Sequence, residues 1–287
     1  MTAVQSQLSH RGLKRAASSL PVLMGLAIFC VWTLAPILWA IICSLLPQSA
    51  LTATPPDLSP GLMTLSNYQA VLSGERDLVH GLINSAVVAS FTAATALVLG
   101  SAAAYALARL HLPGANRILL MILATQMLPG IVLVIPLFIV MSRIGLIDTQ
   151  LGLVIVYLSF ILPVVIWVLK GFFDAVPVEL DRAAAVDGAT PLQTFRLIVL
   201  PISLAPLFAV GVFAFIESWN EFFFAVILTR LGAKTAPVAI AELSGEYITL
   251  FGELLAAAVL ASIPVVVLAV IFRRYILQGF VEGAVKG

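Results

Sequence analysis

Long apolar blocks dominate the pattern along the chain, and most polar residues lie between them. A bilayer core about 30 Å thick requires roughly 20 apolar helical residues. Six blocks meet this length: 20–46, 82–108, 118–141, 151–172, 202–228 and 252–275. They lack the alternation with a period of two that membrane strands show. The pattern therefore predicts an all-α polytopic membrane protein with six transmembrane helices in a single domain, residues 1–287.

The composition supports this class. Of the 287 residues, 61% are hydrophobic and only 10% are charged, whereas soluble domains contain roughly 45–50% apolar residues. The first block is long and has no small-residue cleavage site soon after a short apolar run, so we expect a retained first span. Cys30 and Cys43 lie on this one helix about 20 Å apart and cannot pair. A net charge of +1 gives no indication of a nucleic-acid partner.

The basic residues predict the orientation. With six spans both termini lie on one side, and eleven of the fifteen basic residues fall on that side. These eleven are Arg11, Lys14, Arg15, Arg109, Arg117, Lys170, Arg182, Arg196, Arg273, Arg274 and Lys286. Positive residues mark the cytoplasmic face of a membrane protein. We therefore expect cytoplasmic termini, and a cytoplasmic segment between the fourth and fifth spans.

That segment, "PVELDRAAAVDGATPLQTFRLIVLP" (177–201), is polar and has strong helix signals. Pro177 can open a helix, and Glu179 and Asp181 then lie in its first turn, where negative charge is favoured. Gly188 is expected to end this helix after Val186, because glycine tolerates the left-handed backbone of a turn.

A second helix is expected directly after the turn. Thr190-Pro191-Leu192-Gln193 has the form of a capping box with proline at the first helical position. Ala183, Ala184 and Ala185 make one side of the first helix thin, so another protein surface could approach its backbone. The alternative is an ordinary cytoplasmic loop in which the alanines only favour helix.

This segment resembles the "EAA" loop of ATP-binding-cassette importer permeases. The matching residues are Ala183, Ala184, Asp187, Gly188, Ala189, Ile198, Leu200 and Pro201. The segments "SWNEFFFAVIL" (218–228) and "EGAVKG" (282–287) resemble the maltose-type branch of sugar permeases. The chain is thus similar to a carbohydrate importer permease over most of its length.

The resemblance implies a type I importer permease fold, in which the loop at 174–200 forms a coupling helix that seats on a cytoplasmic ATPase. The implied coupling residues are Glu179, Asp181, Arg182, Ala183, Ala184, Asp187, Gly188 and Ala189. Arg182 stands where that family usually has Glu, so Glu179 or Asp181 could supply the acidic contact instead. The implied tail contacts to the ATPase pair are Val285, Lys286 and Gly287.

The implied partners are a second homologous permease, two cytoplasmic ATPase subunits, an extracytoplasmic sugar-binding protein and membrane lipid, with no nucleic acid. No cofactor is expected on this chain, because ATP and Mg would bind the ATPase subunits. The implied location is the inner membrane of a prokaryote. The outer loop 229–251, with Lys234, Glu242 and Glu246, would meet the binding protein, although simple solvation of that loop is the default interpretation.

A polar stripe in the fifth block is the main candidate for the substrate pathway. Its members, spaced to share one face of a continuous helix, are Glu217, Asn220, Glu221 and Phe224. Such polar groups can bond sugar hydroxyls, and an aromatic ring can pack on a pyranose. Gln126 is added from the third block, and Asn84 and Tyr157 are weaker candidates. A structural pair of carboxylates at a broken helix or subunit contact is the alternative.

Two other functional classes are weighed against an importer subunit. A self-contained secondary transporter would use Glu217 and Glu221 as proton-coupling carboxylates, although no inverted repeat is evident. A membrane-embedded enzyme is the other class, but the sequence shows no His/Asp or Ser/Lys set placed to work together in catalysis. The sequence has no phosphate-binding loop motif, which is consistent with ATP hydrolysis by a partner. Disaccharides or short oligosaccharides are the preferred substrates, with polyols and glycerol phosphates open.

Overall fold

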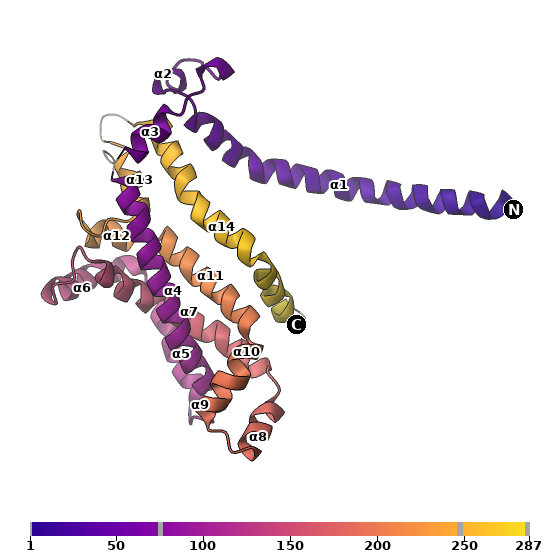
Figure 1. Ribbon diagram of the computed structural model, residues 1–287, viewed down its shortest axis with the longest axis vertical. Coiled ribbons are helices and arrows are strands. Elements are labelled where there is room, and N and C mark those ends of the chain that lie inside the picture. The colour runs from indigo at the N-terminus through magenta and orange to yellow at the C-terminus, as the bar shows by residue number, and fades with distance from the viewer. Residues whose placement is uncertain (1, 74–76, 246–248, 285–287) are drawn as a thin grey trace.

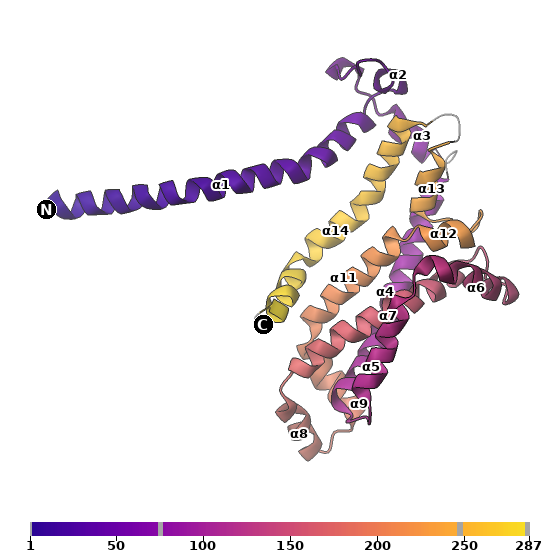
Figure 2. The same cartoon turned by 180° about the vertical axis from the view of Figure 1, so that it is seen from behind.

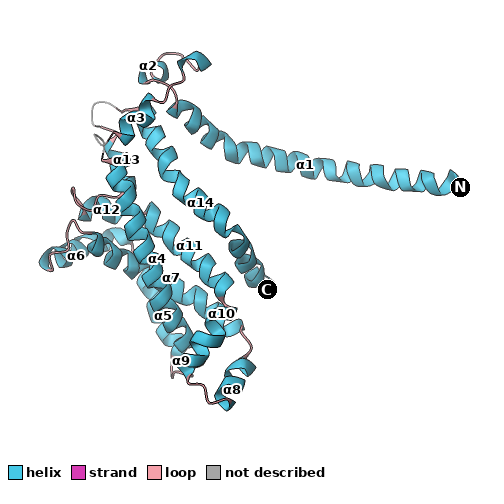
Figure 3. Ribbon diagram, viewed as in Figure 1, coloured by secondary structure: helices cyan, strands magenta, loops and turns pink. Residues whose placement is uncertain are grey.

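The structure is a computed structural model that describes residues 2–73, 77–245 and 249–284, with side chains described from residue 22 to residue 275. Within these ranges the chain is helical and contains no strand (Figure 3). An isolated bridge between Ser244 and Thr249 is the one extended pairing in the described part. The all-α class predicted from the sequence is confirmed.

Four helices are individually long and apolar enough to cross a membrane. They are α1 (Thr2–Ser44), α4 (Leu78–Arg109), α7 (Gln150–Ala175) and α14 (Phe251–Ala284). Their candidate spans are Val22–Ser44, Leu78–Arg109, Gln150–Ala175 and Phe251–Tyr275. These spans overlap the first, second, fourth and sixth apolar blocks of the sequence.

The third block is bent in the middle. Helix α5 (Ala115–Ala124) and the short η2 (Thr125–Met127) meet α6 (Gly130–Arg143) at 94°. Leu128 has an extended backbone, with φ −77° and ψ 122°, because the ring of Pro129 disfavours helical geometry in the residue before it. The bent pair can count as one span or as two separate pieces.

The fifth block is also broken. The run α9 (Pro191–Thr194), η3 (Phe195–Val199, one π-helical turn) and α10 (Leu200–Ile202) meets α11 (Leu204–Asn220) at 82°. Pro206 has no N–H to donate to the carbonyl of Ile202, so the helix cannot continue with regular bonds through this point. The described chain thus has four unbroken candidate spans, or up to six if each bent pair is one span.

The predicted continuity of the fifth block to residue 228 is wrong. Helix α11 ends at Asn220, Glu221 is extended, and a separate short helix, α12 (Phe223–Leu228), follows. The four polar-stripe residues are therefore not on one continuous helix.

The core forms where α4 packs against α7 and α11 (Figures 1 and 2). Helices α4 and α7 run in the same direction, since Asn84 contacts Gln150 at one end and Arg109 contacts Phe173 at the other. Gly100 lies against the buried Val165, and a Cβ there would come within 2.6 Å of the Val165 side chain. Small residues allow such close approach of helices in membrane proteins.

Short helices cover the two ends of this bundle (Figure 1). At one end, called the α13 end, lie α2 (Gln48–Leu51), η1 (Pro60–Leu62), α3 (Ser66–Leu72) and α13 (Ala236–Glu242). At the opposite end, called the α8 end, lie α8 (Val178–Val186) and α9. Helix α1 meets the bundle at the α13 end and extends away from it (Figures 1 and 2).

Candidate functional site

The α8–α9 segment, residues 177–194, is a helix, a sharp turn and a second helix. Gly188 adopts φ +83° after α8. The N–H of Ala189 donates to the carbonyl of Ala184 at 2.9 Å, and the N–H of Gly188 donates to that of Ala185 at 3.1 Å. This pair of bonds is a Schellman motif, in which a left-handed glycine satisfies the last carbonyls of a helix.

The second helix starts with a reciprocal cap. The N–H of Thr190 donates to Oε1 of Gln193 at 2.7 Å, and the N–H of Gln193 donates to Oγ1 of Thr190 at 3.4 Å. Pro191 occupies the first turn of α9, where its missing N–H costs nothing. The predicted end of the first helix at Val186 and the predicted start of the second helix after Thr190 are therefore confirmed. Hydrogen bonds within the segment fix the turn between them.

The outer surface of the α8–α9 segment combines charge with uncovered apolar side chains. Val186 is 87% exposed and Leu192 is 56% exposed. Around them the exposed polar or small members are Glu179, Arg182, Ala183, Asp187 and Gly188, while Ala184 faces inward and Ala189 is half-buried. An exposed apolar patch rimmed by charge is typical of a surface that binds another protein.

The inner side of the segment is fixed by an ion pair with α4. Nη1 of Arg109 lies 3.3 Å from Oδ2 of Asp181, and the two side chains are only 9% and 20% exposed. Nη2 of the same arginine donates to the carbonyl of Phe173 at 2.7 Å and to that of Val176. Of the two acidic residues proposed from the sequence for an external contact, only Glu179 is exposed, because Asp181 is paired within the chain.

The predicted pathway residues divide into two groups. Glu217 and Asn220 are exposed on the last turn of α11. Glu221 instead has a local structural role, since its Oε1 accepts from the N–H of Phe224 at 2.9 Å and its Oε2 accepts from the N–H of Ala225 at 3.2 Å. A carboxylate at the start of a helix accepts hydrogen bonds from the free N–H groups there, and its negative charge interacts favourably with the helix dipole. Glu221 therefore stabilises the beginning of α12.

Phe224 is buried, and its ring stacks on that of Phe160 with centroids 4.8 Å apart. Gln126 is exposed but also bound to α7, because its Nε2 donates to the carbonyl of Phe160 at 3.0 Å. Phe224 and Gln126 thus meet α7 at the same residue. Tyr157 is buried on α7, and its hydroxyl makes no hydrogen bond within the described residues.

Asn84 is buried in a scaffold at the α13 end. Its amide donates to the carbonyls of Gly232 and Lys234, at 3.2 and 2.9 Å, and its Oδ1 accepts from Gln150 at 2.7 Å. Lys234 is also buried, with Nζ 2.8 Å from Glu242 and 3.8 Å from Asp77. These residues therefore hold the loop after α12 against α4, and Lys234 is not a free solvated charge.

Asp148 was not identified from the sequence, although it makes the densest set of side-chain bonds in the described chain. Its carboxylate accepts from the N–H groups of Arg230, Leu231, Gly232 and Ala233 at 2.9–3.3 Å. Partial burial alone would raise the pKa of this carboxyl, but the four donors outweigh that effect and lower its pKa from 3.8 to about 2. Asp148 thus clamps the α6–α7 turn to the α12–α13 loop.

The clamp is expected to open in acid. Because the folded pKa of Asp148 is depressed, its contribution to stability is complete above pH 3.8 and is lost as the pH falls toward 2. Asp148→Asn should reproduce the protonated form at neutral pH and speed hydrogen exchange of the 230–233 amides on the order of tenfold. Mass spectrometry of the exchanged protein would measure this. Asp57→Asn, which removes bonds only to nearby Ser59, should leave these amides unchanged; equal exchange in both variants would contradict the clamp.

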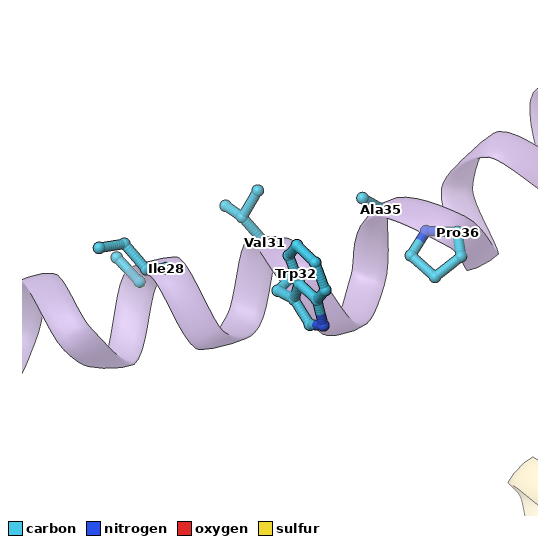
Figure 4. Close-up of a pocket in the computed structure, with 6 residues that line it drawn as sticks. Ile28, Val31, Trp32, Ala35 and Pro36 are labelled. Carbon is cyan, nitrogen blue, oxygen red and sulfur yellow. The ribbon is translucent and has the colours of Figure 1, made fainter.

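The described residues contain no group of three or more side chains able to hold a metal ion. A shallow apolar groove on α1 is lined by Ala27, Ile28, Val31, Trp32, Ala35 and Pro36, all from that one helix (Figure 4). The indole N–H of Trp32 is the one polar side-chain group in this lining, so the groove has little with which to orient a ligand. The predicted tail contacts Val285, Lys286 and Gly287 lie outside the described residues, as does Glu246 of the outer loop.

Comparison with known proteins identifies relatives among membrane transport proteins. Residues 96–281 match the family described as "Binding-protein-dependent transport system inner membrane component". The trehalose transport system permease protein SugB of Mycobacterium tuberculosis is 40% identical over 259 residues, covering 89% of this chain and 93% of that protein. The trehalose/maltose permease protein MalG of Thermococcus litoralis is 34% identical, covering 93% and 96%.

A solved structure supports the fold. It is a bacterial ABC transporter involved in the import of alginate, and one of its chains matches with a TM-score of 0.74, 23% identity and coverage of 91% of this chain and 96% of that one. The family match covers the last part of α4, all of α7, the α8–α9 segment, α11 and most of α14. This chain therefore belongs to the family of binding-protein-dependent transport system inner membrane components, which are transport subunits and not enzymes.

Proposed function

We propose that this chain is the transmembrane permease subunit of an ATP-driven sugar importer, in which it forms half of the translocation pathway. Membership of the family supports a transport role with a binding protein. Several relatives are named as transporters of trehalose or maltose, and these names favour a glucose-containing disaccharide or short oligosaccharide as substrate.

The observation that carries the coupling role is the uncovered apolar surface of the α8–α9 segment. Val186 and Leu192 extend from a turn that local bonds hold rigid, so docking would cost little conformational entropy. We propose that this surface seats on a cytoplasmic ATPase subunit, with Glu179, Arg182 and Asp187 at its charged rim. The α8 end would then be cytoplasmic, in agreement with its richness in arginine.

The proposed complex contains a second homologous permease, two ATPase subunits and an extracytoplasmic sugar-binding protein. Both termini of this chain would be cytoplasmic. For the pathway we keep Glu217, Asn220 and Gln126 as candidates for contact with sugar hydroxyls, since they are exposed. Glu221 and Phe224 would instead support the break between α11 and α12 that shapes this region.

Co-purification and uptake test the proposal. Solubilised in mild detergent, the chain should bring down an ATPase, and liposomes carrying the complex and the binding protein should take up labelled trehalose or maltose only with internal ATP. A chain that purifies alone and takes up sugar when a proton gradient is the only energy source would support the secondary transporter instead. The hydrogen bonds of Glu221 disfavour a secondary transporter, because one of the two carboxylates assigned to proton coupling is already bound to the start of α12.

A further inference from the structure

Arg109 joins the ends of three helices. It is the last residue of α4, it binds the carbonyls of Phe173 and Val176 at the end of α7, and it pairs with Asp181 on α8. A guanidinium has five donors in a fixed plane, so it can serve several acceptors at once. The α7 carbonyls carry the negative end of a helix dipole, which a cation stabilises.

The ion pair is largely shielded from water. Both carboxylate oxygens of Asp181 are buried and have no hydrogen-bond partner in the described chain, so the nearby guanidinium is the charge that compensates this carboxylate. Removing one partner of a shielded pair leaves an uncompensated charge, which is much more costly than losing an exposed pair. Arg109 therefore fixes the position of α8 relative to α4 and α7.

An aromatic cluster makes a second attachment at the other end of the α8–α9 segment. Tyr105 lies one turn before Arg109 on α4, and its ring centroid is 4.8 Å from that of Phe195 and 6.5 Å from that of Phe173. Phe173 and Phe195 also meet edge to face at 6.3 Å. All three rings are buried, and Phe195 directly follows α9.

The segment is thus attached to α4 at both of its ends, by charge at Asp181 and by apolar packing at Phe195. Its outer surface, with Val186 and Leu192, remains free between the two attachments. We propose that Arg109 is a positioning residue that fastens the α8–α9 segment to α4 and α7, so that a displacement imposed on α8 moves these three helices as one rigid body. This inference rests on the proposed function, in which an ATPase moves α8.

The test uses the complete complex in liposomes, with ATP hydrolysis and sugar uptake measured on the same preparation. Arg109→Met removes the charge and the carbonyl bonds but leaves the docking surface unchanged. We expect normal ATPase capture and a fall of about tenfold or more in sugar transported per ATP hydrolysed. Arg109→Lys, which keeps a charge for Asp181 but has no planar set of donors, should give an intermediate ratio.

Asp174→Asn is the matched control. It breaks the Lys170–Asp174 pair, which has an N–O distance of 2.7 Å but joins residues within α7 alone, so the ratio should stay as in the unmodified complex. An unmodified complex that fails to capture ATPase would refute the proposed function. A complex that captures ATPase, but in which Arg109→Met transports with the normal ratio, would refute only the role of Arg109.

A distance measurement covers the case in which Arg109→Met does not assemble. Spin labels on Leu110→Cys, next to the end of α4, and on Leu180→Cys, in α8 but outside the charged rim of the docking surface, are introduced after Cys30 and Cys43 are replaced by serine. With Arg109 intact, the distance between the labels should be the same in the nucleotide-free complex and with a non-hydrolysable ATP analogue. A distance that changes with nucleotide would show that α8 moves independently of α4 and would overturn the inference.

Discussion

Val186→Asp is expected to abolish ATPase capture and to lower ATP-driven sugar uptake by about thirtyfold or more. Val186 is 87% exposed at the end of α8 and contributes almost nothing to the packing of the chain. A charge at the centre of a protein interface must lose its water without gaining a partner. The few residues that dominate an interface lie near its centre and each contribute about 2 kcal/mol or more, about thirtyfold in affinity.

Co-purification from detergent and uptake in liposomes measure these two effects. The permease itself should remain folded, because substitutions at such exposed positions usually change stability by less than about 0.5 kcal/mol. Its yield and its melting temperature in detergent check this. Leu65→Asp is the control, since Leu65 is an exposed apolar residue at the α13 end, where it precedes α3. Normal ATPase capture by Val186→Asp would refute docking through this surface.

The features that could be predicted from the sequence are those fixed by nearby residues. The turn of the α8–α9 segment follows from a glycine at a helix end and from a four-residue capping box, and the bonds that form this turn lie within the segment itself. The apolar blocks likewise depend on local composition. The helix end at Val186 and the capping box at Thr190 are confirmed, whereas the third and fifth apolar blocks are broken by bends that apolar composition alone does not indicate.

The break after Asn220 has no comparable local signal. Neither proline nor glycine interrupts residues 217–228, and helical periodicity predicts three polar residues and one aromatic residue on one face. The chain turns there because Glu221 caps a new helix and because Phe224 stacks on Phe160 of a different helix. A contact between residues so distant in the chain cannot be read from the spacing of polar residues.

The contacts of Asp148 and Arg109 also join residues distant in the chain, so the sequence pattern does not reveal them. Asp148 binds backbone groups 82–85 residues later in the chain, and backbone donors have no residue identity that a sequence pattern could reveal. For Arg109 the sequence shows only a positive charge near the end of an apolar block. Its acceptors at Phe173 and Val176 lie 64 and 67 residues away, and only the parallel packing of α4 on α7 brings them together.

Gly152→Ala is expected to prevent stable folding of the α6–α7 turn and to reduce the yield of the protein strongly. A Cβ at this position would lie 2.2 Å from the backbone oxygen of Leu146, which is far too close for two non-bonded atoms in a packed protein. That oxygen cannot move freely, because it accepts a bond of 2.8 Å from the Thr149 hydroxyl, which in turn caps α7 through the N–H of Gly152. The damage should also reach the neighbouring Asp148 and the loop that it clamps.

Gly171→Ala is the matched control for this prediction. Gly171 lies on the same helix, but a Cβ there would meet no atom within 4 Å, and alanine favours a helix over glycine by up to about 1 kcal/mol. The same chemical change should therefore lower the melting temperature at 152 and leave it equal or higher at 171, as measured by thermal unfolding in detergent. If Gly152→Ala melts like the unmodified protein, the turn is not held as tightly as the Thr149 cap implies.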